Sequence, residues 1–248
     1  GIHGQRSSNS NFISNDIEVQ GDYAIDAYDC DFSRIDSNNI RGYGDGFEYG
    51  IRAHDSYYVN IEHNDIEDFR EYGIYFRNSA NGIVNHNRLI GADNGGWMRG
   101  IDNEASNQFA QVNYNYIELL HTEGGSHVDK IGIIVHDSEV IGDSVLVYSS
   151  SQYNCEGHGI YADRSTIQDN YIRIDDPSDY YGGGTGISSY GDGAPRHTIS
   201  NNVIEATRES RGIWASYADI ENNYISNWSD NNNDEWAIGH GDYNVIRN

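Results

Sequence analysis

The sequence has few of the residues that other repeat folds and membrane proteins require. Among its 248 residues there are two prolines, two cysteines, one methionine and a single lysine, Lys130. Leucine is scarce and no long stretch is rich in alanine and leucine, which excludes leucine-rich and helical repeats. No apolar run approaches the roughly 18 residues that a membrane-spanning helix needs. The sequence therefore predicts neither a helical solenoid nor a transmembrane span.

Positive charge is also scarce. The chain has 15 basic residues against 39 acidic ones, which gives a formal net charge of −24. A nucleic-acid partner is excluded, because binding to the phosphate backbone requires a basic surface. Salt screens the self-repulsion of such a charge, so the acidic and lysine-poor composition favours a protein from a halophile. The alternative is an acidic extracellular protein that binds calcium.

What the sequence does contain is an asparagine that recurs at one place in a repeat. The pattern is apolar-x-x-Asn-x-apolar, and neighbouring matches lie roughly 21 to 32 residues apart, a spacing in the range of solenoid repeats. One unit carries Asp143 in the asparagine position. The other matches are at Asn15, Asn38, Asn64, Asn87, Asn115, Asn170, Asn202, Asn223 and Asn248.

A second signature, a small residue followed by isoleucine, alternates with the first. The two together define about ten units of about 26 residues, and a period in this range indicates a solenoid. The apolar runs are short, β-branched and alternate with period two, so each unit is predicted to consist of strands. The isoleucines are Ile2, Ile25, Ile51, Ile74, Ile101, Ile133, Ile160, Ile187, Ile213 and Ile238.

These repeats, Gly-Ile-x-x followed by Ile-x-x-Asn-x-Ile, resemble the right-handed parallel β-helix of the pectate-lyase-like superfamily along the whole chain. The resemblance implies an all-β solenoid of about ten rungs with three short strands each. At a strand spacing of about 4.8 Å the rod would be about 48 Å long. The asparagines would form a ladder, because Asn tolerates left-handed backbone and can hydrogen-bond along the stack. No activity is implied, since this architecture hosts lyases, hydrolases, epimerases and tailspikes.

Residues 1–248 are expected to form a single β-helix domain. Solenoids need capping units, and neither end of the sequence resembles one, so the chain is expected to be a fragment or mature part of a larger protein. The two cysteines, Cys30 and Cys155, would lie about five rungs apart. That separation, roughly 24 Å at the strand spacing, excludes a disulfide between them.

Alternation along the Gly-Ile strands predicts a functional face. With each isoleucine in the core, the residues one and three positions later point outward. The first outward column is His3, Asp26, Arg52, Tyr75, Asp102, Ile134, Tyr161, Ser188, Trp214 and Gly239. The second is Tyr28, His54, Arg77, Glu104, His136, Asp163, Tyr190, Ser216 and Gly241.

This outward strip suits an extended polysaccharide, because aromatic rings stack on sugar faces while arginines and carboxylates hold hydroxyls or uronates. The alternative is a solvated sheet face whose aromatic pairs only stabilise the sheet. The residues predicted to hold sugars are Arg52, His54, Tyr75, Arg77, Tyr161, Tyr190 and Trp214.

Four residues in the middle of the strip are the predicted catalytic group: Asp102, Glu104, His136 and Asp163. A glycosidase needs two carboxyl groups about 5–9.5 Å apart, and residues i and i+2 of a strand are roughly 6.6 Å apart. The three acids would serve as acid, base or nucleophile, and His136 would adjust their charge. A charge-balanced structural ladder is the alternative. A lyase would instead use Lys130 as its base.

Two functions fit these features. The first is an extracellular, carbohydrate-active β-helix that binds a polysaccharide or cell-surface glycan and, as a hydrolase or lyase, cleaves it. The second is a non-catalytic rod from a halophile, such as a stalk, an adhesin or a virion spike, as a homotrimer or larger assembly. No cofactor or metal motif is required. Calcium is an optional ligand of the acidic runs at 175–179 and 230–235.

Overall fold

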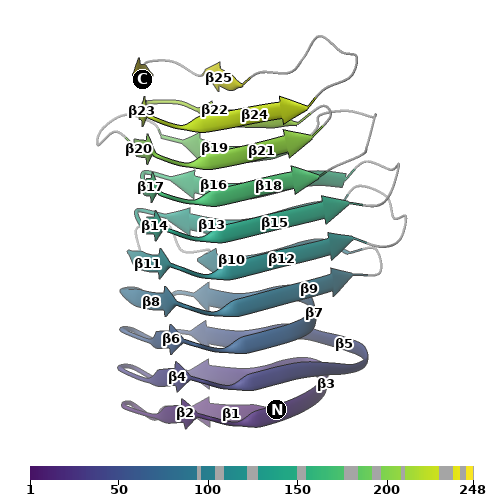
Figure 1. Ribbon diagram of the computed structural model, residues 1–248. Helices are drawn as coiled ribbons and strands as arrows, with labels where there is room; N and C mark the ends of the chain where they lie inside the picture. The colour runs from purple at the N-terminus through teal and green to yellow at the C-terminus, as the bar shows by residue number, and fades with distance from the viewer. Residues whose placement is uncertain are drawn as a thin grey trace.

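In the computed structural model, the chain forms a parallel β-solenoid of stacked strands (Figure 1). The structure describes residues 1–93, 96–103, 109–121, 128–149, 155–175, 184–191, 197–207, 210–228, 237–240 and 244–247. All described elements are strands, and the strand pairs are parallel, which confirms the predicted fold class. Among these residues, no helix has the length and hydropathy needed to cross a membrane.

The strands form two sheets. The ten-stranded sheet consists of β2 (Asn11–Ile13), β4 (Arg34–Asp36), β6 (Asn60–Glu62), β8 (Gly82–Asn85), β11 (Ala110–Asn113), β14 (Glu139–Ile141), β17 (Thr166–Gln168), β20 (His197–Ser200), β23 (Ala218–Glu221) and β26 (Val245–Arg247).

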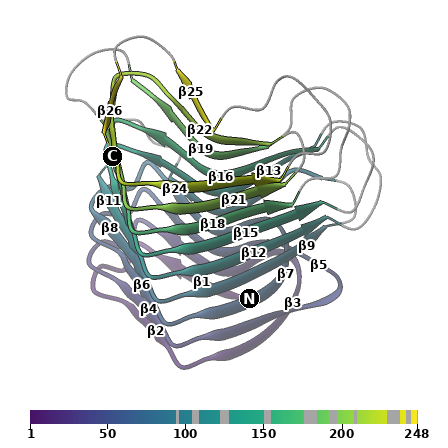
Figure 2. The same cartoon turned by 45° about the horizontal axis from the view of Figure 1, so that its top comes forward.

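The 16-stranded sheet bends around a corner of the solenoid (Figure 2). Its first strands are β1 (Ile2–Gln5) and the long strands β3 (Asp16–Tyr28), β5 (Asn39–His54) and β7 (Asp65–Arg77). Beyond β7, separate strands form the two sides. One side has β9 (Arg88–Asp93), β12 (Tyr116–His121), β15 (Ser144–Ser149), β18 (Tyr171–Asp175), β21 (Val203–Thr207) and β24 (Tyr224–Trp228). The other side has β10 (Met98–Asn103), β13 (Val128–His136), β16 (Cys155–Asp163), β19 (Thr185–Tyr190), β22 (Arg211–Ala215) and β25 (Ile238–His240).

The isoleucines of the Gly-Ile repeat stack in register and fill the core. Ile51, Ile74 and Ile101 pair in adjacent strands, and all three are fully buried. Burying such a side chain contributes about 1.5–3 kcal/mol. The preceding glycine is required by space: a Cβ on Gly100 would lie 2.5 Å from the carbonyl oxygen of Gly132. The repeat therefore combines a large residue in the core with a glycine where two backbones approach closely.

The predicted asparagine ladder is present and continuous from Asn15 to Asn223. In each step the backbone N–H of one ladder residue donates to the side-chain oxygen of the next. In every step except the one from Asp143, the side-chain amide donates to the same oxygen. Between Asn64 and Asn87 the two distances are 3.0 and 2.9 Å. Asp143 occupies its predicted place between Asn115 and Asn170. The ladder gives hydrogen bonds to the side-chain polar groups of its buried members, except Oδ2 of Asp143.

The left-handed backbone lies one residue earlier than expected. Ladder asparagines do not have positive φ among the described residues, whereas the residue before each of them does, for example Ser37 (φ 56°), His63 (φ 55°) and Tyr114 (φ 57°). The prediction that the ladder Asn itself adopts this conformation was wrong. The asparagine is selected by its side-chain hydrogen bonds, because its amide both donates and accepts along the stack.

Candidate functional site

The two outward columns of the Gly-Ile strands are confirmed by the strand register. Asp26, Arg52, Tyr75 and Asp102 pair in successive strands. In the second column, Tyr28, His54 and Arg77 pair in succession, as do His136, Asp163 and Tyr190. The column between them is buried, including Ala53 and other small or apolar residues. The hydrophobic core contains Ala53 and Phe76 of this middle column and none of the described residues of the two outer columns, which agrees with the facing predicted from period two. Glu104, however, lies outside the described residues.

At the N-terminal end, an ion-pair cluster forms around Asp26. Arg52 donates Nε and Nη2 to its two carboxylate oxygens at 2.8 and 2.9 Å, and the rings of His3 and His54 approach it to 2.8 and 3.4 Å. Burial raises the pKa of Asp26, but the hydrogen bonds and charge of Arg52, together with His54 and His3, outweigh burial, so the pKa lies below its usual value. The side chains of Arg52 and His54 are 21% and 19% exposed. Two predicted sugar-binding residues are thus already engaged within the protein.

An aromatic column beside this cluster was not anticipated from the sequence. Tyr23, Tyr49 and Tyr72 pair two positions before the core isoleucines, and their ring centroids are 5.0 and 4.8 Å apart. Tyr75 packs on Tyr72 at 4.5 Å and is only 7% exposed. The signal was available, because these tyrosines recur at the same distance from Gly-Ile. Their mutual stacking stabilises the sheet and covers much of Tyr75.

Asp102, the first predicted catalytic carboxylate, is fully buried and forms an ion pair with Arg99, three residues earlier. Two strand spacings separate it from the strand of Asp163, because Asp102 pairs with Ile134 and Ile134 pairs with Tyr161. That is about 10 Å along the solenoid axis. The structure therefore does not bring Asp102 together with Asp163.

His136 and Asp163, by contrast, meet in an open pocket of about 340 Å³ at the C-terminal half of the strip. Two of the predicted sugar-binding residues, Tyr161 and Tyr190, line the same pocket, and their ring centroids are 5.6 Å apart. We call this the tyrosine pocket, and its lining residues are His136, Tyr161, Asp163, Arg164, Tyr190, Gly191 and Ser216.

Charges in the tyrosine pocket are paired. Asp163 lies 2.8 Å from Nη1 of Arg164 and 3.6 Å from Nδ1 of His136. Arg164 also donates Nε and Nη2 to Asp137 at 2.7 and 2.8 Å. Arg164 adopts a left-handed conformation (φ 47°) directly after the strand, which places its guanidinium between two carboxylates. Arg164 was not predicted from the sequence, because turn residues lie outside the alternating pattern of a strand.

A buried histidine lies beneath the tyrosine pocket. His197 is fully buried, and its Nδ1 is 2.7 Å from the hydroxyl oxygen of Ser189. A Cβ on Gly191, which lines the pocket, would lie 2.1 Å from Nε2 of His197. Burial lowers the pKa of His197, so the ring is neutral near pH 7. Because Gly191 has no side chain, the backbone that lines the pocket lies directly against the neutral imidazole of His197.

The other predicted sugar-binding residues lie outside this pocket. Arg77 is exposed, and Trp214 is half-buried beside the guanidinium of Arg211, which lies 4.9 Å from its ring. Lys130, the candidate lyase base, is fully buried and its Nζ contacts the carbonyl of Gly96. The acidic run 230–235 and most of 175–179 lie outside the described residues, so the calcium hypothesis stays a prediction.

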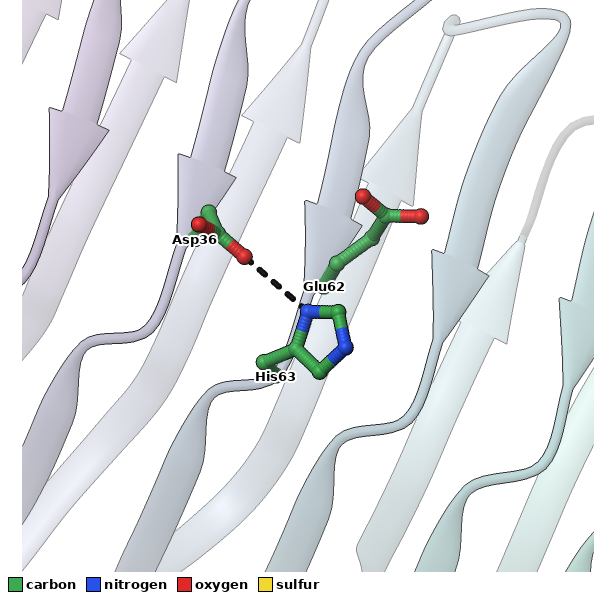
Figure 3. Close-up of side chains that lie close together, drawn as sticks. All are labelled: Asp36, Glu62 and His63. Atoms are coloured by element: carbon green, nitrogen blue, oxygen red, sulfur yellow. Dashed lines mark hydrogen bonds and ion pairs between the residues drawn. The ribbon is translucent and has the colours of Figure 1, made fainter.

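One group in the described part of the chain has the composition of a metal site. Asp36, Glu62 and His63 each offer a ligand atom, and these atoms lie within 4.8 Å of one another (Figure 3). The group lies on the ten-stranded sheet, away from the strip. This group was not predicted from the sequence, because Asp36 lies one rung before Glu62 and His63.

Comparison with known proteins agrees with the fold. Searches of curated proteins and of solved structures return no significant match. The family model described as "Right handed beta helix region" matches residues 1–143, which is more than half of the chain. Together with the parallel solenoid and its asparagine ladder, this match shows that the chain belongs to the right-handed β-helix family.

Proposed function

We propose that this protein is an extracellular carbohydrate-binding β-helix that holds a polysaccharide in the tyrosine pocket. The observation that carries the proposal is the pair of rings of Tyr161 and Tyr190, 5.6 Å apart, beside hydrogen-bonding groups in one open pocket. Tyrosine presents an apolar face to the face of a sugar ring and a hydroxyl to its polar edge. Asp163, His136 and Ser216 add further groups that can bond sugar hydroxyls.

The charge balance favours a neutral glycan segment. The chain carries a net charge of −24, which repels polyanions at low and moderate salt. Arg164, the lining guanidinium, is already paired with Asp163 and Asp137, so its charge is compensated within the protein. A uronate would have to compete with both carboxylates for this group. Neutral sugars form hydrogen bonds with the same side chains without that competition.

Cleavage needs more than the described part of the pocket supplies. A glycosidase uses two carboxyl groups about 5–9.5 Å apart, and Asp163 is the one carboxylate among the described residues that line the pocket. Asp163 and His136 remain the proposed catalytic residues for a hydrolase. Asp102 is a poorer candidate, because it is buried and paired with Arg99. Binding is therefore the primary activity that we propose.

Replacing Tyr190 by alanine should weaken glycan binding roughly 3- to 10-fold, because one stacking ring is lost. Tyr190 is 43% exposed, so the variant should fold normally. The measurement is a screen of neutral and anionic polysaccharides at moderate and high salt, followed by titration of the best ligand. The same reactions should be assayed for new reducing or unsaturated ends, which separates binding from cleavage.

A matched control is Tyr224→Ala, which removes an exposed tyrosine (64% exposed) on β24, outside the pocket lining. Its affinity should equal that of the unmodified protein. Equal losses in both variants would contradict the assignment of the pocket. Failure to bind any glycan would instead favour the non-catalytic rod, a function that the continuous asparagine ladder also supports because it ties successive rungs together.

A further inference from the structure

The cluster of Asp36, Glu62 and His63 lies at the C-terminal ends of two neighbouring strands of the ten-stranded sheet. Asp36 ends β4 and Glu62 ends β6, and the two are direct partners in the strand register. His63 follows Glu62 in the turn, with φ 55°, and its Nδ1 lies 3.1 Å from Oδ1 of Asp36. Figure 3 shows the three side chains as they project from neighbouring rungs. Parallel stacking thus brings two carboxylates and one imidazole to a single point.

Each of these three side chains is held by a neighbour outside the cluster. Arg34 donates Nη2 to Oδ2 of Asp36 at 3.0 Å, which leaves Oδ1 directed at His63. Asn60 donates to Oε2 of Glu62, also at 3.0 Å. Such outer partners orient metal ligands and contribute to metal affinity. They leave Oδ1 of Asp36 directed at the imidazole and Oε1 of Glu62 without this neighbour.

The ring of His63 is held in another way. It stacks on His86 with ring centroids 5.3 Å apart, and His86 stacks on Tyr114 at the same distance. These three residues occupy the same left-handed position in successive turns. The stack restricts rotation of the His63 ring, which lowers the entropic cost of binding a ligand at its nitrogen.

A further polar side chain, Asn85, lies on the strand next to Glu62. Asn85 is the register partner of Glu62 on the next strand, and its Oδ1 is buried without a hydrogen-bond partner. A buried amide oxygen without a partner is costly, because it has lost its contact with water. A cation held by Glu62 on the neighbouring strand would lower that cost.

We propose that Asp36, Glu62 and His63 bind a divalent transition-metal ion of the Zn²⁺ class, with Asn85 at the margin of the site. Imidazole nitrogen with carboxylate oxygen is a donor set that suits zinc and its neighbours, whereas Ca²⁺ and Mg²⁺ prefer oxygen alone. The ion replaces the proton shared between His63 Nδ1 and Asp36 Oδ1. The site is independent of the tyrosine pocket, which lies on the other sheet.

The test is a titration of the whole chain with Zn²⁺, by calorimetry at 150 mM salt, roughly physiological ionic strength. Visible absorption of bound Co²⁺ provides a second readout of nitrogen and oxygen ligation. We expect one saturable site, with affinity reduced about tenfold or more in both His63→Gln and Glu62→Gln. The matched control is His3→Gln, because His3 is equally exposed (57% against 55%) and also pairs with a buried aspartate, Asp26.

The possible results separate cleanly. Saturable binding that is lost in His63→Gln and Glu62→Gln but kept in His3→Gln supports the site, provided that circular dichroism shows all variants folded. Weak, unsaturable uptake by the acidic surface would overturn it. So would an unchanged affinity in His63→Gln, or an equal loss in His3→Gln. Ca²⁺ at the same concentration should compete poorly, and strong competition by Ca²⁺ would contradict the assigned metal class.

Discussion

Replacing Asp143 by asparagine should stabilise the protein at neutral pH, because Asp143 is the single carboxylate in the described asparagine ladder. It is fully buried, and burial raises its pKa well above the ordinary value. Its Oδ1 accepts two hydrogen bonds from Asn115, at 2.7 and 2.9 Å, but its Oδ2 is buried without a partner. An unpaired buried polar atom costs about 1–3 kcal/mol. The substitution should recover roughly that amount.

The neighbouring rungs show what the asparagine would do. The side-chain amides of Asn115 and Asn170 donate to the carbonyls of Val84 and Val140 at 2.8 and 3.0 Å. By the strand register, the equivalent acceptor for position 143 is the carbonyl of Val112. A carboxylate cannot donate to this oxygen, whereas an amide or a protonated carboxyl can. Asp143→Asn should therefore complete the ladder.

The gain should depend on pH with a definite sign. The folded protein keeps a proton on Asp143 at pH values where the unfolded chain, with an ordinary aspartate pKa of about 3.9, has released it. The contribution of Asp143 to the free energy of unfolding is fully present below about pH 4. It is lost as the pH rises through the pKa that Asp143 has in the folded protein. The difference between variant and unmodified protein should be small at low pH and largest at neutral pH.

Thermal unfolding of both proteins between pH 3.5 and 8 measures this difference, with about 2–4 °C expected for each kcal/mol. The control is Asp22→Asn, which removes one exposed carboxylate and changes the net charge by the same amount. If Asp22→Asn stabilises the protein as much as Asp143→Asn, the cause is the net charge of −24 and not the ladder. A gain that does not change with pH would also count against the explanation.

Period and register explain why so much of this fold could be predicted from sequence. The asparagine motif identified the ladder, including Asp143, and the Gly-Ile motif identified which residues point outward. Both inferences rest on the alternation of strands and on stacking at a constant spacing, which hold for every rung. The position of the left-handed residue was misassigned, because one motif of consecutive residues does not show which of them turns the chain.

The candidate site was less predictable, because its features arise between the strands. The tyrosine pocket depends on Arg164 and Gly191, which follow strands and escape the alternating pattern. Asp102 was assigned to an open surface, but Arg99 pairs with it and the side chain is buried. Alternation gives the direction of a side chain and not its exposure. Exposure depends on which side chains fold over it, and these come from the same strand, as Arg99 does, or from other rungs.

Replacing Asn87 by alanine should be among the most damaging single changes in the ladder. Asn87 is 1% exposed, and its Oδ1 accepts from the backbone and side-chain amides of Asn64 at 3.0 and 2.9 Å. Its own amide donates to the carbonyl of Ile61 at 2.9 Å and to Oδ1 of Asn115 at 3.0 Å. Alanine leaves these buried groups unpaired at about 1–3 kcal/mol each. We expect a total loss of about 3–5 kcal/mol.

Thermal or urea unfolding measures this loss, which should lower the melting temperature by about 10 °C. The matched control is Asn39→Ala, because the side-chain amide of Asn39 donates a hydrogen bond near the surface, to Asp16 at 2.9 Å. Its loss should be about 1 kcal/mol. Similar losses in the two variants would mean that the ladder adds little beyond ordinary surface bonds.

A second substitution at the same position connects this prediction with the first. Asn87→Asp keeps the size of the side chain and its acceptor oxygen but removes the donor to Ile61 and Asn115. It should destabilise the protein at neutral pH and approach the stability of the unmodified chain below about pH 4, where a protonated carboxyl can donate again. This is the reverse of the change expected for Asp143→Asn. If the ladder is held by side-chain donors, the two substitutions must show opposite pH dependence, and agreement in sign would refute that mechanism.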